Sequence, residues 1–182
     1  SLGERYEVLR ELGSGGMATV YLASDRKHGR DVAIKVLRPE VATAVGPERF
    51  LREISIAANL SHPNILPLHD SGDAGGLLYF VMPHATGESL RDRLDRSGPL
   101  PIDEVLHIAT DVADALDFAH ARGVVHRDVK PGNILLEAGH ALVTDFGIAL
   151  AVGAAQATRQ TSGGYTVGTP AYLSPEACAG EA

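Results

Sequence analysis

The chain has 182 residues, 45% of them hydrophobic, which is typical of a folded globular protein and argues against disorder. Its 16 basic and 23 acidic residues give a net charge of −7, which argues against a nucleic-acid or membrane-surface binder. We expect a cytoplasmic segment without membrane contact, because no apolar run approaches the roughly 20 residues that span a bilayer, no signal peptide is recognisable and Cys178 is the only cysteine.

The first part of the chain predicts strands. Apolar and β-branched runs at residues 6–12, 18–24 and 31–37 are separated by glycine-rich or charged turns and indicate an antiparallel meander. A helix is expected from about residue 47, since Pro47 suits a first helical position. Residues 66–71 and 77–82 predict two further strands.

The second part predicts helices first and short strands later. Residues 88–96 indicate a short charged helix, and residues 101–122 indicate the strongest helix of the chain. Its apolar stripe consists of Ile102, Val105, Leu106, Ala109, Val112, Ala113, Leu116 and Ala119. Strands are expected near 124–125, 134–137 and 141–144, and residues 145–175 show no clear period, which in a compact domain indicates a functional segment or a misread element.

Two features of the first part favour phosphate chemistry without proving it. Gly13-Ser14-Gly15-Gly16 lies between two predicted strands, where glycines let backbone N–H groups approach phosphate oxygens, but an ordinary hairpin turn is an equal alternative. Lys35 stands inside an apolar strand and has a candidate partner in Glu53 on the following helix, a pair that would hold the ammonium over ATP phosphates. Considered alone, this pair is better explained as a surface ion pair of little energetic weight.

Residues 126–133 carry the strongest signal, because they place an acid, a base and an amide in one tight loop. The Asp128 carboxylate could accept or orient a hydroxyl proton, and the Asn133 amide oxygen could ligate magnesium. Asp145, in Asp145-Phe146-Gly147, supplies a further carboxylate for the metal. Either tripeptide, His126-Arg127-Asp128 or Asp145-Phe146-Gly147, could occur alone by chance. The presence of both in this order is very improbable by chance. His28, His69, His84, His107, His120 and His140 show no metal-ligand spacing and are interpreted as surface or satisfied core groups.

Together these segments resemble the eukaryotic-like (Hanks-type) serine/threonine protein kinases, in particular their bacterial branch. The matching set covers the whole chain: Gly13-x-Gly15-x-x-Ala18-x-Val20, Ala33-Ile34-Lys35, Glu53, His62-Pro63-Asn64-Ile65, His126-Arg127-Asp128, Asn133, Asp145-Phe146-Gly147 and Gly168-Thr169-Pro170 to Ser174-Pro175-Glu176. Ala18 in place of a third loop glycine, Gly132 in the catalytic loop and Ser174 in place of alanine depart from the family pattern.

The resemblance implies an α+β, two-lobed protein kinase-like fold. Residues 1–82 would form an ATP-binding N-lobe with an antiparallel five-stranded sheet plus one helix, residues 83–87 a hinge, and residues 88–182 a partial, mainly helical C-lobe. ATP and Mg²⁺, with Mn²⁺ as an alternative, would bind between the lobes. The chain would stop before the usual end of such a domain, so that the apolar stripe of the 101–122 helix would be partly uncovered and residues 1–182 alone would be poorly soluble and nearly inactive.

The resemblance also implies roles for single residues. Lys35 would contact the α- and β-phosphates and pair with Glu53, Asp128 would take the substrate's hydroxyl proton, and Lys130 would steady the γ-phosphate. Asn133 and Asp145 would hold the metal. The remaining ATP-binding residues would be Gly13, Ser14, Gly15 and Gly16 at the phosphates, Met82 as gatekeeper, Pro83 and Ala85 through their backbone at adenine, and Val20, Ala33 and Leu135 around the base, where an ordinary core role is compatible.

The implied function is transfer of the ATP γ-phosphate to serine or threonine hydroxyls of a protein substrate. A pseudokinase that binds ATP or a protein partner, and a small-molecule kinase of related fold, are the alternatives. Phosphorylation at Thr161 is expected, with Ser162, Thr158 and Thr166 as alternatives and Thr169 as a structural contact to the catalytic loop. A homodimer that phosphorylates itself in trans is a further expectation, and the parent protein could be membrane-anchored.

Overall fold

The computed structural model describes residues 2–146, 170–172 and 175, which divide into two compact units. The first unit comprises Ser1–Asn59 and Pro67–Ala85, and the second comprises Leu60–Leu66 and Thr86–Ala182. Residues 60–66, which lie inside the stretch expected to form the N-lobe, thus belong to the second unit. None of the helices in the described part of the chain is long and apolar enough to cross a bilayer.

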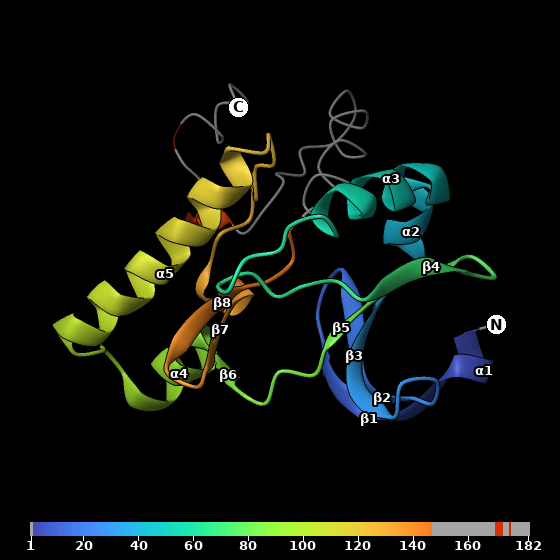
Figure 1. The fold of residues 1–182 in the computed structure, drawn as a ribbon, viewed down its shortest axis with the longest axis horizontal. Coiled ribbons are helices and arrows are strands. Elements are labelled where there is room, and N and C mark those ends of the chain that lie inside the picture. Colours follow the sequence, from blue (N-terminus) through green and yellow to red (C-terminus); the bar gives the residue numbers. More distant parts are fainter. Residues whose placement is uncertain (1, 147–169, 173–174, 176–182) are drawn as a thin grey trace. The chain divides into compact units, whose positions relative to one another are not determined.

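The first unit is built on a five-stranded antiparallel sheet, as the sequence predicts (Figure 1). Its strands follow the order β1 (Tyr6–Ser14), β2 (Ala18–Asp25), β3 (Arg30–Leu37), β5 (Leu77–Pro83) and β4 (Asp70–Ala74). The strand expected at 66–71 instead begins at Asp70, because Leu66 bonds to the second unit while the polar Asp70–Ala74 segment pairs with β5.

Three helices accompany this sheet, whereas the sequence predicts one. Helix α3 (Pro47–Ala57) begins at the expected proline and buries Phe50 and Ile54. The additional helices are α1 (Leu2–Arg5) and α2 (Pro39–Val45). Helix α2 escapes prediction because its seven residues include β-branched valine and threonine, which are weak helix formers, and its burial of Ala42 and Val45 compensates for them.

A buried carboxylate ties the start of the chain to the sheet. Asp25 is 1% exposed and accepts hydrogen bonds from Arg5 at 3.2 Å and from the backbone N–H of Lys27 at 3.1 Å. His28 lies 2.8 Å from the same carboxylate. The Arg5 hydrogen bond, opposed by burial, holds the pKa of Asp25 well below its usual range, so this carboxylate stays ionised at neutral pH.

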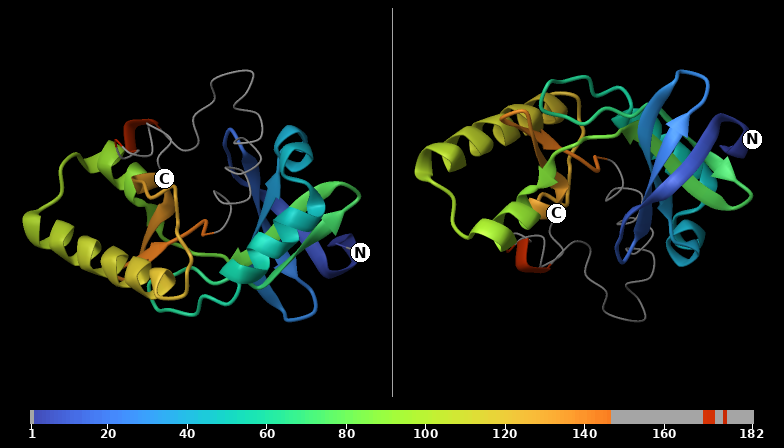
Figure 2. Two further views of the ribbon diagram at one scale, coloured as in Figure 1. Left: turned by 90° about the horizontal axis from the view of Figure 1, so that it is seen from above. Right: turned by 90° about the horizontal axis from the view of Figure 1, so that it is seen from below.

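The second unit packs two helices around a small antiparallel sheet. Its elements are β6 (Glu88–Ser89), α4 (Leu90–Ser97), α5 (Ile102–His120), the 3₁₀ turns η1 (Pro131–Asn133) and η2 (Pro170–Tyr172), β7 (Ile134–Glu137) and β8 (His140–Val143), with sheet order β6-β7-β8. Residues 124–125, expected to be a strand, lie in an irregular connection. In both views of Figure 2, α5 runs beside the orange β7–β8 hairpin.

The 60–66 segment joins this unit through backbone pairing and an asparagine side chain. Ile65 pairs in parallel with Val143, and the N–H groups of Val143 and Leu66 donate to Asn64 and Val143 carbonyls at 2.8 and 3.0 Å. The Asn64 side chain donates to Ala141 O at 3.0 Å. These bonds satisfy the outer edge of β8, which is why the segment separates from the first unit.

Helix α5 leaves part of its predicted apolar stripe uncovered, as expected, and buries mainly the face toward the hairpin. Ile102, Val105 and Leu106 are 77%, 47% and 60% exposed. The residues it buries are Ile108, Asp111, Ala115 and Ala119. Asp111 selects this face because its carboxylate accepts the Ala141 backbone N–H at 2.8 Å, which requires the helix to turn a polar residue toward the hairpin.

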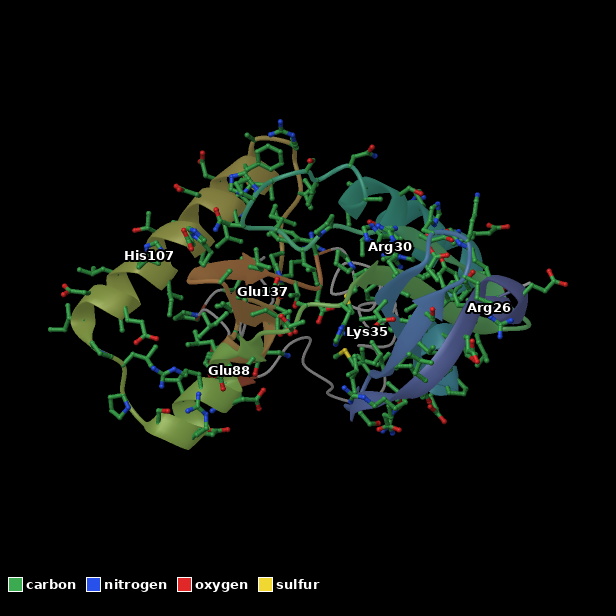
Figure 3. All side chains as sticks on the ribbon, turned by 60° about the horizontal axis from the view of Figure 1, so that its bottom comes forward. Arg26, Arg30, Lys35, Glu88, His107 and Glu137 are labelled. Atoms are coloured by element: carbon green, nitrogen blue, oxygen red, sulfur yellow. The ribbon has the colours of Figure 1, made fainter. Side chains whose placement is uncertain are left out.

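Gly87, the residue before β6, lets the chain pass close to the backbone of β7. Thr86 donates its backbone N–H and its hydroxyl to Glu137, labelled in Figure 3, at 2.7 and 3.1 Å. Glu88 then pairs with Leu136. Between these contacts, a Cβ on Gly87 would overlap the Leu136 carbonyl oxygen and lie 2.8 Å from its carbonyl carbon.

We therefore expect Gly87→Ala to disturb the β6–β7 pairing. The free energy of unfolding should fall by about 1–3 kcal/mol, the usual cost of overpacking against groups that cannot move freely. Thermal unfolding measures the effect. Gly132→Ala is the matched control, because a Cβ there meets nothing within 4 Å. Equal melting temperatures for the two variants would contradict the prediction.

Candidate active site

A buried histidine organises the loop that carries Asp128. His126 is 1% exposed, and its Nδ1 accepts the Asp128 backbone N–H at 3.2 Å. Because Nδ1 is an acceptor, the proton of the neutral ring is on Nε2, which donates to the Thr144 carbonyl at 2.7 Å. Burial lowers the pKa of His126 below its ordinary value, which keeps the ring neutral and this bonding pattern fixed.

The Asp128 carboxylate is held by two neighbours in the same loop. Lys130 Nζ lies 2.7 Å from Asp128 Oδ2. The Asn133 amide nitrogen donates to the same oxygen at 3.0 Å and to the Asp128 carbonyl at 2.8 Å. Arg127 adopts a left-handed conformation, with φ of 67°, to turn the chain into this loop. The acid, the base and the amide that the sequence groups together therefore form one contact cluster.

The same contacts orient Asn133. Because its amide nitrogen is bonded to Asp128, its amide oxygen is the atom that this buried residue can offer a cation. Amide and carboxylate oxygens are the ligands that Mg²⁺ prefers, so the residue fits the metal-binding role that the sequence indicates.

The hairpin brings Asp145 to Asn133 along the backbone. Ile134 pairs with Val143, and the Thr144 N–H donates to the Asn133 carbonyl at 2.9 Å, which makes Asp145 the next residue after that contact. Asp145 has a left-handed φ of 65°, and the following Phe146 ring packs on His126 with centroids 4.5 Å apart. Both predicted metal ligands therefore leave the same end of the β7–β8 hairpin.

The glycine-rich segment closes the β1–β2 hairpin of the first unit. Gly13 pairs with Val20, Ser14 pairs with Thr19, and the Gly15 N–H donates to the Ala18 carbonyl at 2.9 Å. A Cβ at Gly13 or Gly16 would meet nothing within 4 Å among the described residues. The packing around this turn therefore does not require glycine, whereas close approach of a phosphate would.

Several predicted ATP-binding residues share one face of this sheet. Directly paired residues of antiparallel strands point to the same side, and Lys35 pairs with Val20 and with Phe80, while Ala33 pairs with Met82. Lys35 Nζ lies 6.0 Å from the centre of the Phe80 ring. Val20 and Lys35 are half-buried, and Ala33 and Met82 are buried.

Glu53 is buried in α3 but contacts a different cation from the one expected. Its Oε1 accepts a hydrogen bond from Arg52 at 3.4 Å, and its buried Oε2 has no hydrogen-bond partner within the described structure. An ionised oxygen in that position is costly until a cation reaches it. The Lys35–Glu53 pair stays a prediction, which the unsatisfied oxygen favours.

The other expected sites are divided between the units or lie outside the description. Pro83 ends β5, Ala85 follows it, and both are half-buried, while Leu135 belongs to β7 of the second unit, where it pairs with Ser89. Gly147 and the expected phosphorylation and contact residues Thr158, Thr161, Ser162, Thr166 and Thr169 lie outside the described residues.

His107 and His140 are exposed, as interpreted from the sequence, but they are not isolated. The structure brings His107 and His140 together with Asp111, so that potential metal-ligand atoms of all three lie within 4.8 Å of one another. The signal available in the sequence was the four-residue spacing of His107 and Asp111 on a predicted helix. His140 could not be added to it, because only the packing of α5 on the hairpin makes it a neighbour.

Comparisons with known proteins agree with this geometry. Residues 6–182 match the protein kinase domain family. The serine/threonine-protein kinase PknB of Mycobacterium leprae is 44% identical over 188 residues, covering 99% of this chain and 30% of that protein. PrkC of Bacillus subtilis, also a serine/threonine-protein kinase, is 42% identical over 178 residues, covering 97% of this chain and 27% of that protein.

A solved structure gives the same result for the fold. The crystal structure of Rad53 residues 1–466 in complex with AMP-PNP matches with a TM-score of 0.79 and 27% identity, covering 99% of this chain and 44% of that one. The chain spans only 30% and 27% of the length of the PknB and PrkC relatives. With its catalytic-loop cluster, its five-stranded sheet and these matches, the chain belongs to the protein kinase domain family, alongside bacterial serine/threonine-protein kinases.

Proposed function

We propose that the protein transfers the γ-phosphate of ATP to serine or threonine hydroxyls of a protein substrate. The observation that carries this proposal is the Asp128 carboxylate, held by Lys130 at 2.7 Å and by the Asn133 amide at 3.0 Å. A carboxylate fixed in this way can accept a hydroxyl proton at a defined position. The names of the relatives and the AMP-PNP bound by the Rad53 neighbour support the same reaction.

The residues of the second unit would perform the proton and cation work. Asp128 accepts the proton of the substrate hydroxyl, and Lys130 is placed to hold negative charge next to that acid. Asn133 and Asp145 offer oxygen atoms to Mg²⁺, which when bound neutralises phosphate charge. Manganese, which also accepts oxygen ligands, is the alternative ion.

The residues of the first unit would bind the nucleotide. Lys35 supplies a positive charge on the sheet face that also carries Val20, Ala33 and Met82, and the Gly13–Gly16 turn offers backbone N–H groups with open space around them. The presence of Lys35, Asp128, Asn133 and Asp145 in one chain argues against a pseudokinase.

The metal role of Asp145 predicts loss of turnover without loss of fold. Asp145→Asn should remove most magnesium-dependent phosphate transfer, because the neutral amide is a much weaker ligand for a hard cation. Asparagine is the informative change, since it tolerates the left-handed φ of 65° that would strain alanine. Transfer of labelled phosphate, measured in the complete protein that contains this chain, would refute the role if it stayed at the wild-type rate.

The proton-accepting role of Asp128 predicts a different signature. Asp128→Asn should lower kcat by roughly 10²–10⁴-fold, the usual contribution of a positioned acid–base group, while nucleotide affinity barely changes. The amide keeps an oxygen that accepts a hydrogen bond from Asn133 or Lys130, so the loop should persist. Asp117→Asn, an exposed change on α5, is the control. Lost nucleotide binding with normal turnover would exclude this role.

Regulation by phosphorylation is a further prediction, for residues outside the described ones. Thr161 should carry phosphate in the active protein, because a phosphate can order its segment through charge-assisted bonds to arginine, and Arg127 precedes the catalytic acid. Mass spectrometry of the active protein tests this. Full activity with no phosphate between residues 158 and 166 would contradict it. If two copies phosphorylate one another, the initial rate per molecule should rise with protein concentration.

A further inference from the structure

Three potential metal ligands meet where α5 packs on the β7–β8 hairpin. His107 and Asp111 are one helical turn apart on α5, and His140 is the first residue of β8. Figure 3 labels His107 on α5 beside the hairpin. One ring nitrogen of each histidine and one Asp111 oxygen lie within 4.8 Å of one another. All three residues belong to the second unit.

Two of the three separations between these atoms are close to those of a tetrahedral site. Ligands about 2.0–2.2 Å from Zn²⁺ are about 3.4 Å from one another at tetrahedral angles. Asp111 Oδ2 lies 3.7 Å from His107 Nε2 and 3.4 Å from His140 Nδ1. The two rings are tilted by 47°, with centroids 5.5 Å apart, so small side-chain rotations would bring all three atoms to one ion.

The backbone orients this cluster before any ion binds. Asp111 is 8% exposed, and the Ala141 N–H donates to its Oδ2 at 2.8 Å, which holds the carboxylate in place. Such bonds to a ligand from a neighbouring group usually set its direction toward a metal. The left-handed turn at Ala138 and Gly139, with φ of 50° and 86°, places His140 opposite the helix. The histidine side chains are 52% and 63% exposed, which leaves a path for an ion and a water ligand.

The cluster has another possible role as a set of hydrogen bonds that hold α5 to the hairpin. His107 Nε2 already lies 3.0 Å from the Gly139 carbonyl oxygen, which accepts a hydrogen bond from the Nε2–H group. Coordination through Nε2 would move that proton to Nδ1 and exchange this bond for the metal bond. Beside this bonded pair, a second exposed imidazole from another element lies 3.4 Å from the same carboxylate oxygen and supplies a third potential ligand.

We propose that His107, Asp111 and His140 bind a divalent transition-metal ion, with Zn²⁺ as the expected occupant. Two imidazoles and one carboxylate favour zinc over the magnesium expected at Asn133 and Asp145, because magnesium prefers an all-oxygen shell. The site lies at the turn of the hairpin, and Asn133 and Asp145 lie at its opposite end. A bound ion would cross-link α5 to the hairpin that carries both of those residues.

Zinc titration of the complete protein that contains this chain tests the proposal. Every variant carries Cys178→Ser, which removes the one thiol of this chain. Isothermal titration calorimetry, without a histidine tag, should detect one site that His107→Ala and His140→Ala each weaken by at least about 10-fold, the lower end of the loss seen when only a supporting residue is changed. His120→Ala, an exposed histidine on the same helix, should leave that site unchanged.

A second variant separates metal binding from folding. Asp111→Asn keeps an oxygen that can accept the Ala141 N–H, so the helix should stay in place, but the anionic ligand is lost. The rise in melting temperature caused by zinc should therefore be smaller than in the parent, whatever the melting temperature without metal. An equal zinc-induced rise in the parent, Asp111→Asn and His140→Ala proteins, or no zinc binding by the parent, would overturn the proposal.

Discussion

One buried, uncharged histidine determines the geometry of the catalytic loop. His126 receives the Asp128 N–H on one ring nitrogen and donates to the Thr144 carbonyl from the other, so a single ring spans the loop and the end of β8. A second proton would turn the accepting nitrogen into a donor facing an N–H group. Burial, by keeping the ring neutral, therefore preserves the position of the acid as well as the core. The Phe146 ring packed on His126 couples the residue after Asp145 to the same element.

Backbone pairing then places groups that are distant in sequence. The β7–β8 ladder carries Asn133 and Thr144 to one end, where the Thr144 N–H bonds to Asn133 and Asp145 follows. Two non-glycine residues at this end, Arg127 and Asp145, adopt left-handed backbone, which costs about 1–3 kcal/mol each and usually marks a functional constraint. The strain is compatible with a stable fold because the surrounding backbone is held by several independent sets of contacts. These come from the hairpin, from His126 and from the 60–66 segment.

The sequence predicted most of the sheet and the composition of the loop, and it failed where only packing decides. Alternating apolar residues and glycine turns were sufficient for β1, β2, β3, β5 and β7. They were insufficient for β4, whose polar residues form a strand only because β5 offers them an edge. In the site, motifs identified Asp128, Lys130 and Asn133, but not the arrangement in which the amide nitrogen is bonded and its oxygen remains for a cation. The contact of Glu53 with Arg52 had no signal in the sequence.

The same limit explains why the His107, Asp111 and His140 cluster is visible only in three dimensions. A helical stripe is assigned by counting apolar residues, and on α5 that count includes the exposed Ile102, Val105 and Leu106 but gives no weight to a polar residue on the face that packs on the hairpin. The face that packs on the hairpin contains Asp111, because an ionised side chain can be buried there with a backbone N–H as its partner. Burying the Asp111 carboxylate beside the hairpin turn also brings two imidazoles close to one of its oxygens. They belong to His107, one helical turn earlier on α5, and to His140, the first residue of β8. A polar residue on the packed face of a helix thus gathers the proposed nitrogen ligands at one end of the hairpin, while the predicted oxygen ligands lie at its other end. The two proposed sites would therefore hold ions of different chemistry at opposite ends of one small sheet.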